Sequence, residues 1–257
     1  MPHDLLSPPL LLACIALIVG IAAFAHGVIG VGFPLITTPC IALLTDLKTA
    51  VLITVLPNIL LNILSILRGG NWRDSLLKHW RLAAYVLLGS LVGTQLLIGL
   101  PAEPLKLALA LMMLVSINLN RLKKLDWSFL RRHRRTSEAA FGLIGGILSG
   151  TVNVSVPPLA IYFIGLDLSP VATVQLFNLC FIVGKLTQAG TLAAHGEFTA
   201  AILWQSAGLT VLAVACLIPG MRIQSRMDAS TYRRWLNHTL LLMAVLMLVQ
   251  VGLAWAR

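Results

Sequence analysis

Long apolar runs separated by short polar segments cover most of the chain. Six of them approach or reach the length of a helix that crosses a ~30 Å hydrocarbon layer at ~1.5 Å per residue. These spans are predicted at 48–67, 82–100, 105–120, 170–193, 198–218 and 235–256. Charged residues, Pro or Gly bound each run. The pattern predicts an all-α polytopic membrane protein.

Two further apolar regions, 8–44 and 139–166, are interrupted near their middles. The interrupting residues are Gly27, Gly30, Gly32 and Pro34 in the first region, and Gly150, Asn153, Ser155, Pro157 and Pro158 in the second. The predicted arms 33–44, 139–150 and 158–166 measure about 18, 18 and 14 Å, so none of them spans the membrane alone. Each region is therefore predicted to be a broken helical hairpin around an unwound centre, and 8–44 either crosses twice or re-enters.

Composition excludes a soluble globular domain, because only 11% of the residues are charged and 58% are hydrophobic. The formal net charge of +10 comes from Lys and Arg gathered in the segments 68–81, 121–135 and 222–234. Positive charge in short loops between apolar spans is typical of the cytoplasmic face of a bacterial plasma (inner) membrane, and it argues against nucleic-acid binding. The three segments share one side only if 139–166 crosses the membrane an even number of times, as a hairpin does.

The two halves of the chain share one order of features. We predict a first repeat at 1–120, a basic cytoplasmic connector at 121–138 and a second repeat at 139–257, each repeat a broken hairpin followed by three spans. Each repeat then crosses the membrane an odd number of times. The second repeat is therefore inverted relative to the first, and both termini are expected outside. Inverted repeats with Gly/Pro-broken segments are typical of secondary transporters, whose site lies at the repeat interface.

The segments around the two breaks resemble the sulfite exporter TauE/SafE family of membrane permeases. The resemblance rests on Ala25–Pro34 with Pro39, and on Gly142–Leu159, which reads GLIGGILSGTVNVSVPPL. It implies transport of a small organic or inorganic sulfur anion such as sulfite, sulfoacetate or a related sulfonate.

Lys185 is the most informative candidate, because it lies inside the span 170–193. A charge at membrane depth indicates function by default, and this one could neutralise an anionic substrate. Asn178, two helical turns earlier on the same face, could donate hydrogen bonds to it. The alternative is that Lys185 snorkels to the membrane surface.

Amides on the spans form a second group of candidates. Asn58 and Asn62 share a helical face beside Pro57, and they either bind substrate or bridge helices. Gln175 and Gln188 leave the same two interpretations open, with packing favoured for Gln188.

The backbone at the breaks is the third candidate, because helix N-termini offer unpaired N–H groups to an anion. Around it, His26, Gly30, Gly32, Asn153 and Ser155 are the candidate site residues, and His26 could carry a coupled proton. The alternative is that the small residues only allow close helix packing. Asp46 and Asp167 precede corresponding helices, and capping of those helices is favoured over a proton relay.

The sequence thus predicts a secondary-active permease for a small sulfur anion, coupled to H⁺ or Na⁺ and surrounded by membrane lipid. Another small anion such as a carboxylate is an alternative substrate, and a non-transporting scaffold subunit is an alternative class. Motifs of the form HExxH, GxSxG, CxxC or a P-loop are absent from the sequence, so neither an enzyme nor a cofactor or metal site is expected.

Overall fold

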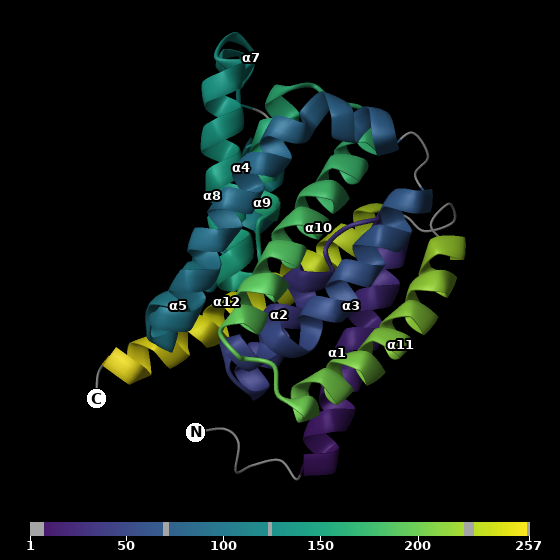
Figure 1. The fold of residues 1–257 in the computed structure, drawn as a ribbon, viewed down its shortest axis with the longest axis vertical. Helices are drawn as coiled ribbons and strands as arrows, with labels where there is room; N and C mark the ends of the chain where they lie inside the picture. The colour runs from purple at the N-terminus through teal and green to yellow at the C-terminus, as the bar shows by residue number, and fades with distance from the viewer. Residues whose placement is uncertain (1–7, 69–71, 123–124, 224–228, 256–257) are drawn as a thin grey trace.

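The computed structural model describes residues 8–68, 72–122, 125–223 and 229–255, and these residues form helices with no strand among them (Figure 1). The first half contains α1 (Pro8–Ile29), α2 (Phe33–Leu44), α3 (Leu47–Arg68), α4 (Trp72–Gly99) and α5 (Ala102–Ile117). Two short helices follow, α6 (Leu119–Leu122) and α7 (Ser128–Arg132). The second half contains α8 (Arg134–Val152), α9 (Val156–Gly165), α10 (Pro170–Ala194), α11 (Ala200–Ile223) and α12 (Ala229–Trp255). The predicted all-helical fold is confirmed.

Within the described residues, five helical segments are long and apolar enough to cross a membrane: α1, α3, the part of α4 at Leu77–Gly99, α10 and α11. The spans expected at 105–120 and 235–256 are not among them. α5 has 16 residues, about 24 Å, because Asn118 ends it by donating its side-chain amide to the carbonyl of Leu114 at 2.9 Å. In α12 the apolar stretch among the described side chains is Leu240–Ala254, and positions 235, 236, 239, 255 and 256 of the predicted span lie outside them.

Both broken regions fold as two helices joined by three non-helical residues. α1 ends at Ile29 and α2 begins at Phe33, while α8 ends at Val152 and α9 begins at Val156. Both boundaries of the second break therefore lie 123 residues after those of the first (29 to 152, 33 to 156). The breaks fall where the sequence places Gly, Asn and Pro.

The same backbone turn opens both breaks. Gly30 has φ 89° and Asn153 has φ 65°, and this left-handed conformation stops a helix. Gly32 and Ser155 then occupy the N-cap positions, followed by a Pro in the first turn of the next helix. The arm α8 is longer than expected, since it begins at Arg134 and its 19 residues extend about 28 Å.

Glycines set the closest helix packing in the bundle. A Cβ on Gly93 of α4 would collide with the carbonyl oxygen of Ile147 on α8, and one on Gly27 of α1 would collide with that of Leu217 on α11. In both pairs the first arm of one hairpin packs on a helix from the other half of the chain. α3 likewise packs on α11, α10 packs on α4, and α5 packs on α12.

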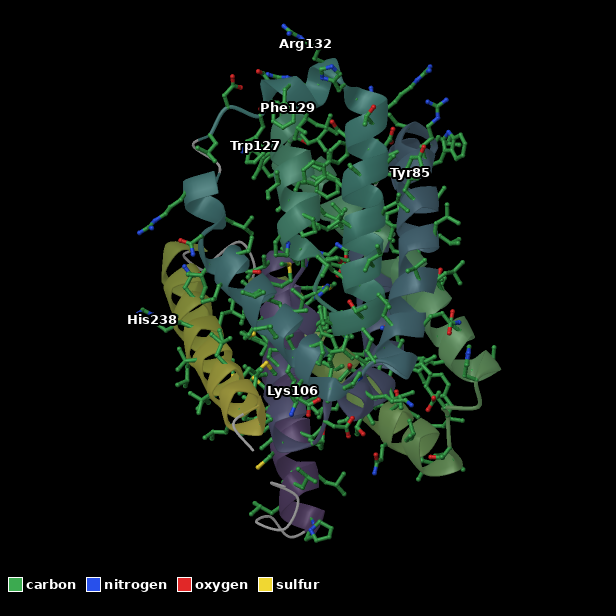
Figure 2. The ribbon with its side chains drawn as sticks, turned by 90° about the vertical axis from the view of Figure 1, so that its left-hand side faces the viewer. Tyr85, Lys106, Trp127, Phe129, Arg132 and His238 are labelled. Carbon is green, nitrogen blue, oxygen red and sulfur yellow. The ribbon has the colours of Figure 1, made fainter. Side chains whose placement is uncertain are left out.

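The basic segments meet at one end of the bundle. Arg68 at the end of α3 donates to the carbonyl of Met221 near the end of α11 at 2.7 Å. Lys78 and Arg81 of α4 line one cavity together with Arg134 and Arg135 of α8. Figure 2 shows Arg132 at this end and Lys106 toward the other.

The second hairpin returns to the same basic end. Gly165, the last residue of α9, packs against the side chain of Leu130 in α7. In the connector before α7, the backbone N–H of Ser128 donates to Asp126 at 2.8 Å and holds the pKa of that carboxyl below its usual range. A hairpin at 139–166 that enters and returns fits this arrangement.

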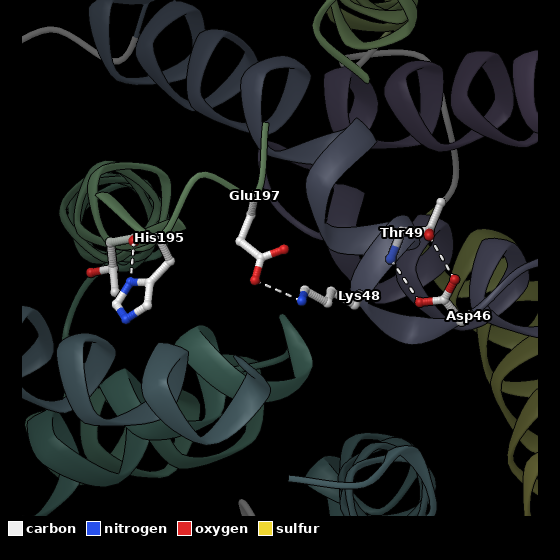
Figure 3. Close-up of polar contacts among 6 residues, drawn as sticks. Asp46, Lys48, Thr49, His195 and Glu197 are labelled. Atoms are coloured by element: carbon white, nitrogen blue, oxygen red, sulfur yellow. Dashed lines mark hydrogen bonds and ion pairs between the residues drawn. The ribbon is translucent and has the colours of Figure 1, made fainter. Parts of the chain in front are cut away.

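The opposite end carries the turn between α2 and α3 and the turn between α10 and α11, which meet through an ion pair of 2.7 Å between Lys48 and Glu197 (Figure 3). Asp46 accepts from the backbone N–H of Thr49 at 2.9 Å and from its hydroxyl at 2.6 Å, so the predicted cap of α3 is confirmed.

The predicted cap of α10 by Asp167 is wrong. Ser169 accepts from the backbone N–H of Ala172 at 3.3 Å and caps this helix instead. Asp167 has φ 55°, and its backbone N–H bonds the carbonyl of Ile164 in the turn that closes α9. It therefore lies too early to face the first turn of α10.

Candidate functional site

Lys185 lies against the second break. Its ammonium donates to the carbonyl of Ser149 at 2.9 Å, to the side-chain oxygen of Gln188 at 2.7 Å and to that of Asn153. Its side chain is 1% exposed, so it does not snorkel to the surface. All three ammonium protons therefore have neutral oxygen partners inside the protein.

The end of α8 explains why a cation and an amide gather at this break. The last four carbonyls of a helix have no partner within it, and they carry partial negative charge. Lys185 bonds the carbonyl of Ser149, and Gln188 donates to the carbonyls of Ser149 and Gly150 at 3.3 and 2.8 Å. Two buried side chains of α10 thus cap a half-helix that ends inside the bundle.

The second break also touches the other half of the chain. Asn153 donates its side-chain amide to the hydroxyl of Thr38 on α2 at 2.9 Å. The same side chain accepts from Lys185, so Asn153 joins α2 to α10 through the break.

His26 has the corresponding place at the first break. It is fully buried, its Nδ1 accepts from the backbone N–H of Phe33 at 3.3 Å, and its Nε2 lies 3.0 Å from the hydroxyl of Ser65 on α3. Since Nδ1 accepts, the proton of the neutral ring sits on Nε2 and Ser65 receives it. His26 therefore satisfies one of the unpaired N–H groups that begin α2.

Asn178 connects α10 to the first break. Its side-chain amide donates to the carbonyl of Gly30 at 2.8 Å and to that of Val174 at 2.8 Å. Asn178 and Lys185 lie about 10 Å apart along α10. One helix of the second half therefore contacts both breaks.

Asn58 and Asn62 bond to each other rather than to another helix. The amide of Asn62 donates to the backbone carbonyl and to the side-chain oxygen of Asn58, both at 2.6 Å. Both residues are fully buried on α3, yet the amide nitrogen of Asn58 and the side-chain oxygen of Asn62 have no hydrogen-bond partner among the described residues. An unpaired buried amide donor is costly, and it is free to meet a ligand.

Of the remaining candidates, Gln175 and Ser155 are buried and Gly32 is partly exposed. Gln175 lies on α10 one turn before Asn178, and Ser155 is the N-cap of α9 without a side-chain capping bond. Gly32 accepts from the backbone N–H of Leu35 at 3.0 Å, which closes the first turn of α2.

Sequence reasoning missed two hydroxyl residues at the breaks, Ser65 and Thr38. Ser and Thr are frequent in membrane helices and usually bond within their own helix, so their residue type alone does not mark these two as site residues. For Ser65 the usable signal was its spacing: it follows Asn58 by seven residues, as Lys185 follows Asn178.

The chemistry available at the breaks is anion recognition. Lys185 brings a basic nitrogen with no carboxylate partner among the described residues. Asn58 offers a free amide donor, and α2 and α9 begin at the breaks with their positive ends. No group of three or more His, Cys, Asp or Glu side chains in the described part of the chain could hold a metal ion.

Long apolar helices, interrupted by breaks whose polar backbone is buried and satisfied by side chains, define a polytopic integral membrane protein with a polar interior. The chain belongs to the sulfite exporter TauE/SafE family, whose model matches residues 15–247. Searches of curated proteins and of solved structures gave no match. Membership indicates a membrane transporter of sulfur anions.

Proposed function

We propose that the protein is a secondary-active permease that carries a small sulfur anion, such as sulfite, sulfoacetate or a related sulfonate, by alternating access around a site between the two breaks. The observation that carries the proposal is the buried ammonium of Lys185, whose three partners are all neutral. A buried cation without a counter-ion is costly unless a ligand supplies negative charge for part of the cycle.

Paired contacts support an inverted repeat. α1 packs on α11 as α8 packs on α4, and α3 packs on α11 as α10 packs on α4. The breaks support it further. Ser65 of α3 bonds His26, and Gln188, which lies 123 residues after Ser65, donates to the carbonyl of Ser149, which lies 123 residues after His26.

In the proposed site the substrate replaces some of the present partners of Lys185. Carbonyl and amide oxygens leave the ammonium when the anion arrives, and the free amide of Asn58 adds a donor. The other residues proposed to surround the substrate are Asn178, Asn62, Gln175, Ser155, Gly30, Gly32 and Asn153. Movement of one half against the other then exposes the breaks to either side in turn.

Coupling is proposed to use H⁺ or Na⁺. His26 is the candidate for a proton, because protonation of Nδ1 would turn an acceptor into a donor and break its bond with the N–H of Phe33. That change would release the first turn of α2.

We place the protein in the bacterial plasma membrane, with the basic end of the bundle in the cytoplasm and both termini outside. The positive-inside rule and the meeting of the three basic segments at one end support this orientation.

The test is flux of labelled sulfite, sulfoacetate and a dicarboxylate into proteoliposomes under imposed proton or sodium gradients. We expect the wild type to transport a sulfur anion and Lys185→Met to lose this flux. Lys106 is a half-buried lysine on α5, and Lys106→Met should transport the anion as the wild type does. Flux of the dicarboxylate without flux of either sulfur anion would show that the substrate is a carboxylate instead. Absence of flux with every solute would favour a scaffold subunit, and a stoichiometric partner would then be expected to copurify.

A further inference from the structure

A cleft lined by cations lies at the basic end of the bundle, away from the two breaks. Lys78, Trp80 and Arg81 of α4 and Arg134, Arg135 and Glu138 of α8 line a cavity of about 380 Å³. A second cavity of about 290 Å³ is lined by Arg81, Arg135 and Glu138 again and extends to Tyr85. We call the two together the basic cleft.

The charges of the basic cleft are not balanced internally. It contains four cations and one carboxylate, and none of its side chains forms an ion pair with another described residue. α8 also begins here, and its N-cap residue, His133, makes no side-chain capping bond, so the positive end of the helix adds to the field. The cleft therefore has the charge of a site for a dianionic or monoanionic phosphate group.

The surface next to the basic cleft is apolar and exposed. Trp80 at its edge is 58% exposed, and the guanidinium of Arg81 lies 5.7 Å from the centroid of its ring. Along α4 beyond Tyr85, Leu88 and Val92 are also exposed, and both share a helical face with Arg81. In a membrane protein such side chains face acyl chains, and Trp marks the depth of the headgroups.

We infer that the basic cleft binds the phosphate headgroup of an anionic phospholipid, whose acyl chains lie along the exposed apolar face of α4. A soluble anion would need no apolar surface beside the cations, and a zwitterionic lipid would not neutralise them. Bound there, the lipid joins α4 of the first half to α8 of the second.

The test is binding of phosphatidylglycerol to the purified full-length protein, measured by native mass spectrometry, with phosphatidylcholine and inorganic phosphate as separate titrations. The cleft variant is Arg81→Gln/Arg135→Gln. The control is Arg131→Gln/Arg132→Gln, which removes the same charge from exposed positions on α7 at the same end. Elution volume and helical content by circular dichroism check folding, and Arg81→Gln alone is the second cleft variant.

We expect wild type and control to bind phosphatidylglycerol in preference to phosphatidylcholine. The dissociation constant should rise roughly fivefold for each cleft arginine removed, since each contributes ~1 kcal/mol near an anionic headgroup. Equal weakening in the control would show a general surface-charge effect and overturn the inference. Tight binding of phosphate alone, or equal binding of phosphatidylcholine, would overturn it as well.

Discussion

Lys185 on α10 donates a 2.9 Å hydrogen bond to the carbonyl of Ser149 on α8, where that half-helix ends inside the bundle. The negative end of a helix dipole and a buried ammonium stabilise each other. Each therefore lowers the free-energy cost of placing the other inside the membrane. Because α8 belongs to a hairpin and α10 to the helix after it, the contact also sets the position of the break relative to the rest of the second half.

Replacing Lys185 by Met should destabilise the protein as well as stop flux. The carbonyl of Ser149 would keep only the 3.3 Å bond from Gln188, and the side-chain oxygens of Gln188 and Asn153 would lose their donor. We expect a loss of about 2–4 kcal/mol in the free energy of unfolding, measured by thermal unfolding in detergent. Lys106→Met is the control, and an unchanged midpoint in Lys185→Met would argue against a capping role.

Asn178→Ala should weaken the attachment of the first break to α10. The variant removes the 2.8 Å bond to the carbonyl of Gly30, which we expect to cost about 1–3 kcal/mol because that carbonyl lies in a buried break. The matched control is Asn118→Ala, which removes the same kind of bond to a carbonyl four residues earlier, but at an exposed site. Similar destabilisation of both would show that the bond to Gly30 contributes nothing.

Gly93→Ala should separate α4 from α8. The added methyl group would collide with the backbone of Ile147, which cannot move aside as a side chain can, so we expect a loss of about 2 kcal/mol or more. Gly208→Ala on α11 is the control, since its Cβ would meet nothing within 4 Å and a better helix former should be neutral or slightly stabilising. The measurement is thermal unfolding of both variants in parallel. A Gly93→Ala variant as stable as the wild type would mean that α4 and α8 are not tightly packed.

The sequence predicted the breaks because the signal is local. Gly30, Asn153 and the following prolines act on their own backbone, so they mark the break without knowledge of the fold. Lys185 was identifiable for a similar reason, since a charge inside an apolar run needs a partner wherever the run lies.

Partners from distant segments could not be predicted in the same way. Thr38 meets Asn153 only because α2 and the second break come together in space, and Ser65 meets His26 only across two helices. The prediction for Asp167 failed on a smaller scale, because a left-handed turn at that residue moved the capping position to Ser169. Tertiary contact and turn geometry decided these cases.

The orientation in the membrane is testable with single cysteines in a variant lacking Cys14, Cys40, Cys180 and Cys216. Ser128→Cys lies in the basic connector and His195→Cys lies at the turn after α10, both at exposed positions. We expect a membrane-impermeant maleimide to label position 195 from outside the cell and position 128 only after the cytoplasmic face is opened. Labelling of both from one face would contradict the inverted topology.

Lys48 and Glu197 provide a test of movement between the halves. Their ion pair joins the start of α3 to the turn before α11 at 2.7 Å, and both side chains are partly exposed, so the pair itself contributes at most about 1 kcal/mol. A carbodiimide that couples an amine directly to a carboxylate should convert it into an amide bond, detectable by peptide mass spectrometry. If transport requires this end of the bundle to open, the linked protein should lose flux of the sulfur anion, whereas Glu197→Gln treated in the same way should keep it. Full flux through linked protein would show that the α2–α3 and α10–α11 turns stay together throughout the cycle, and opening would then have to occur elsewhere.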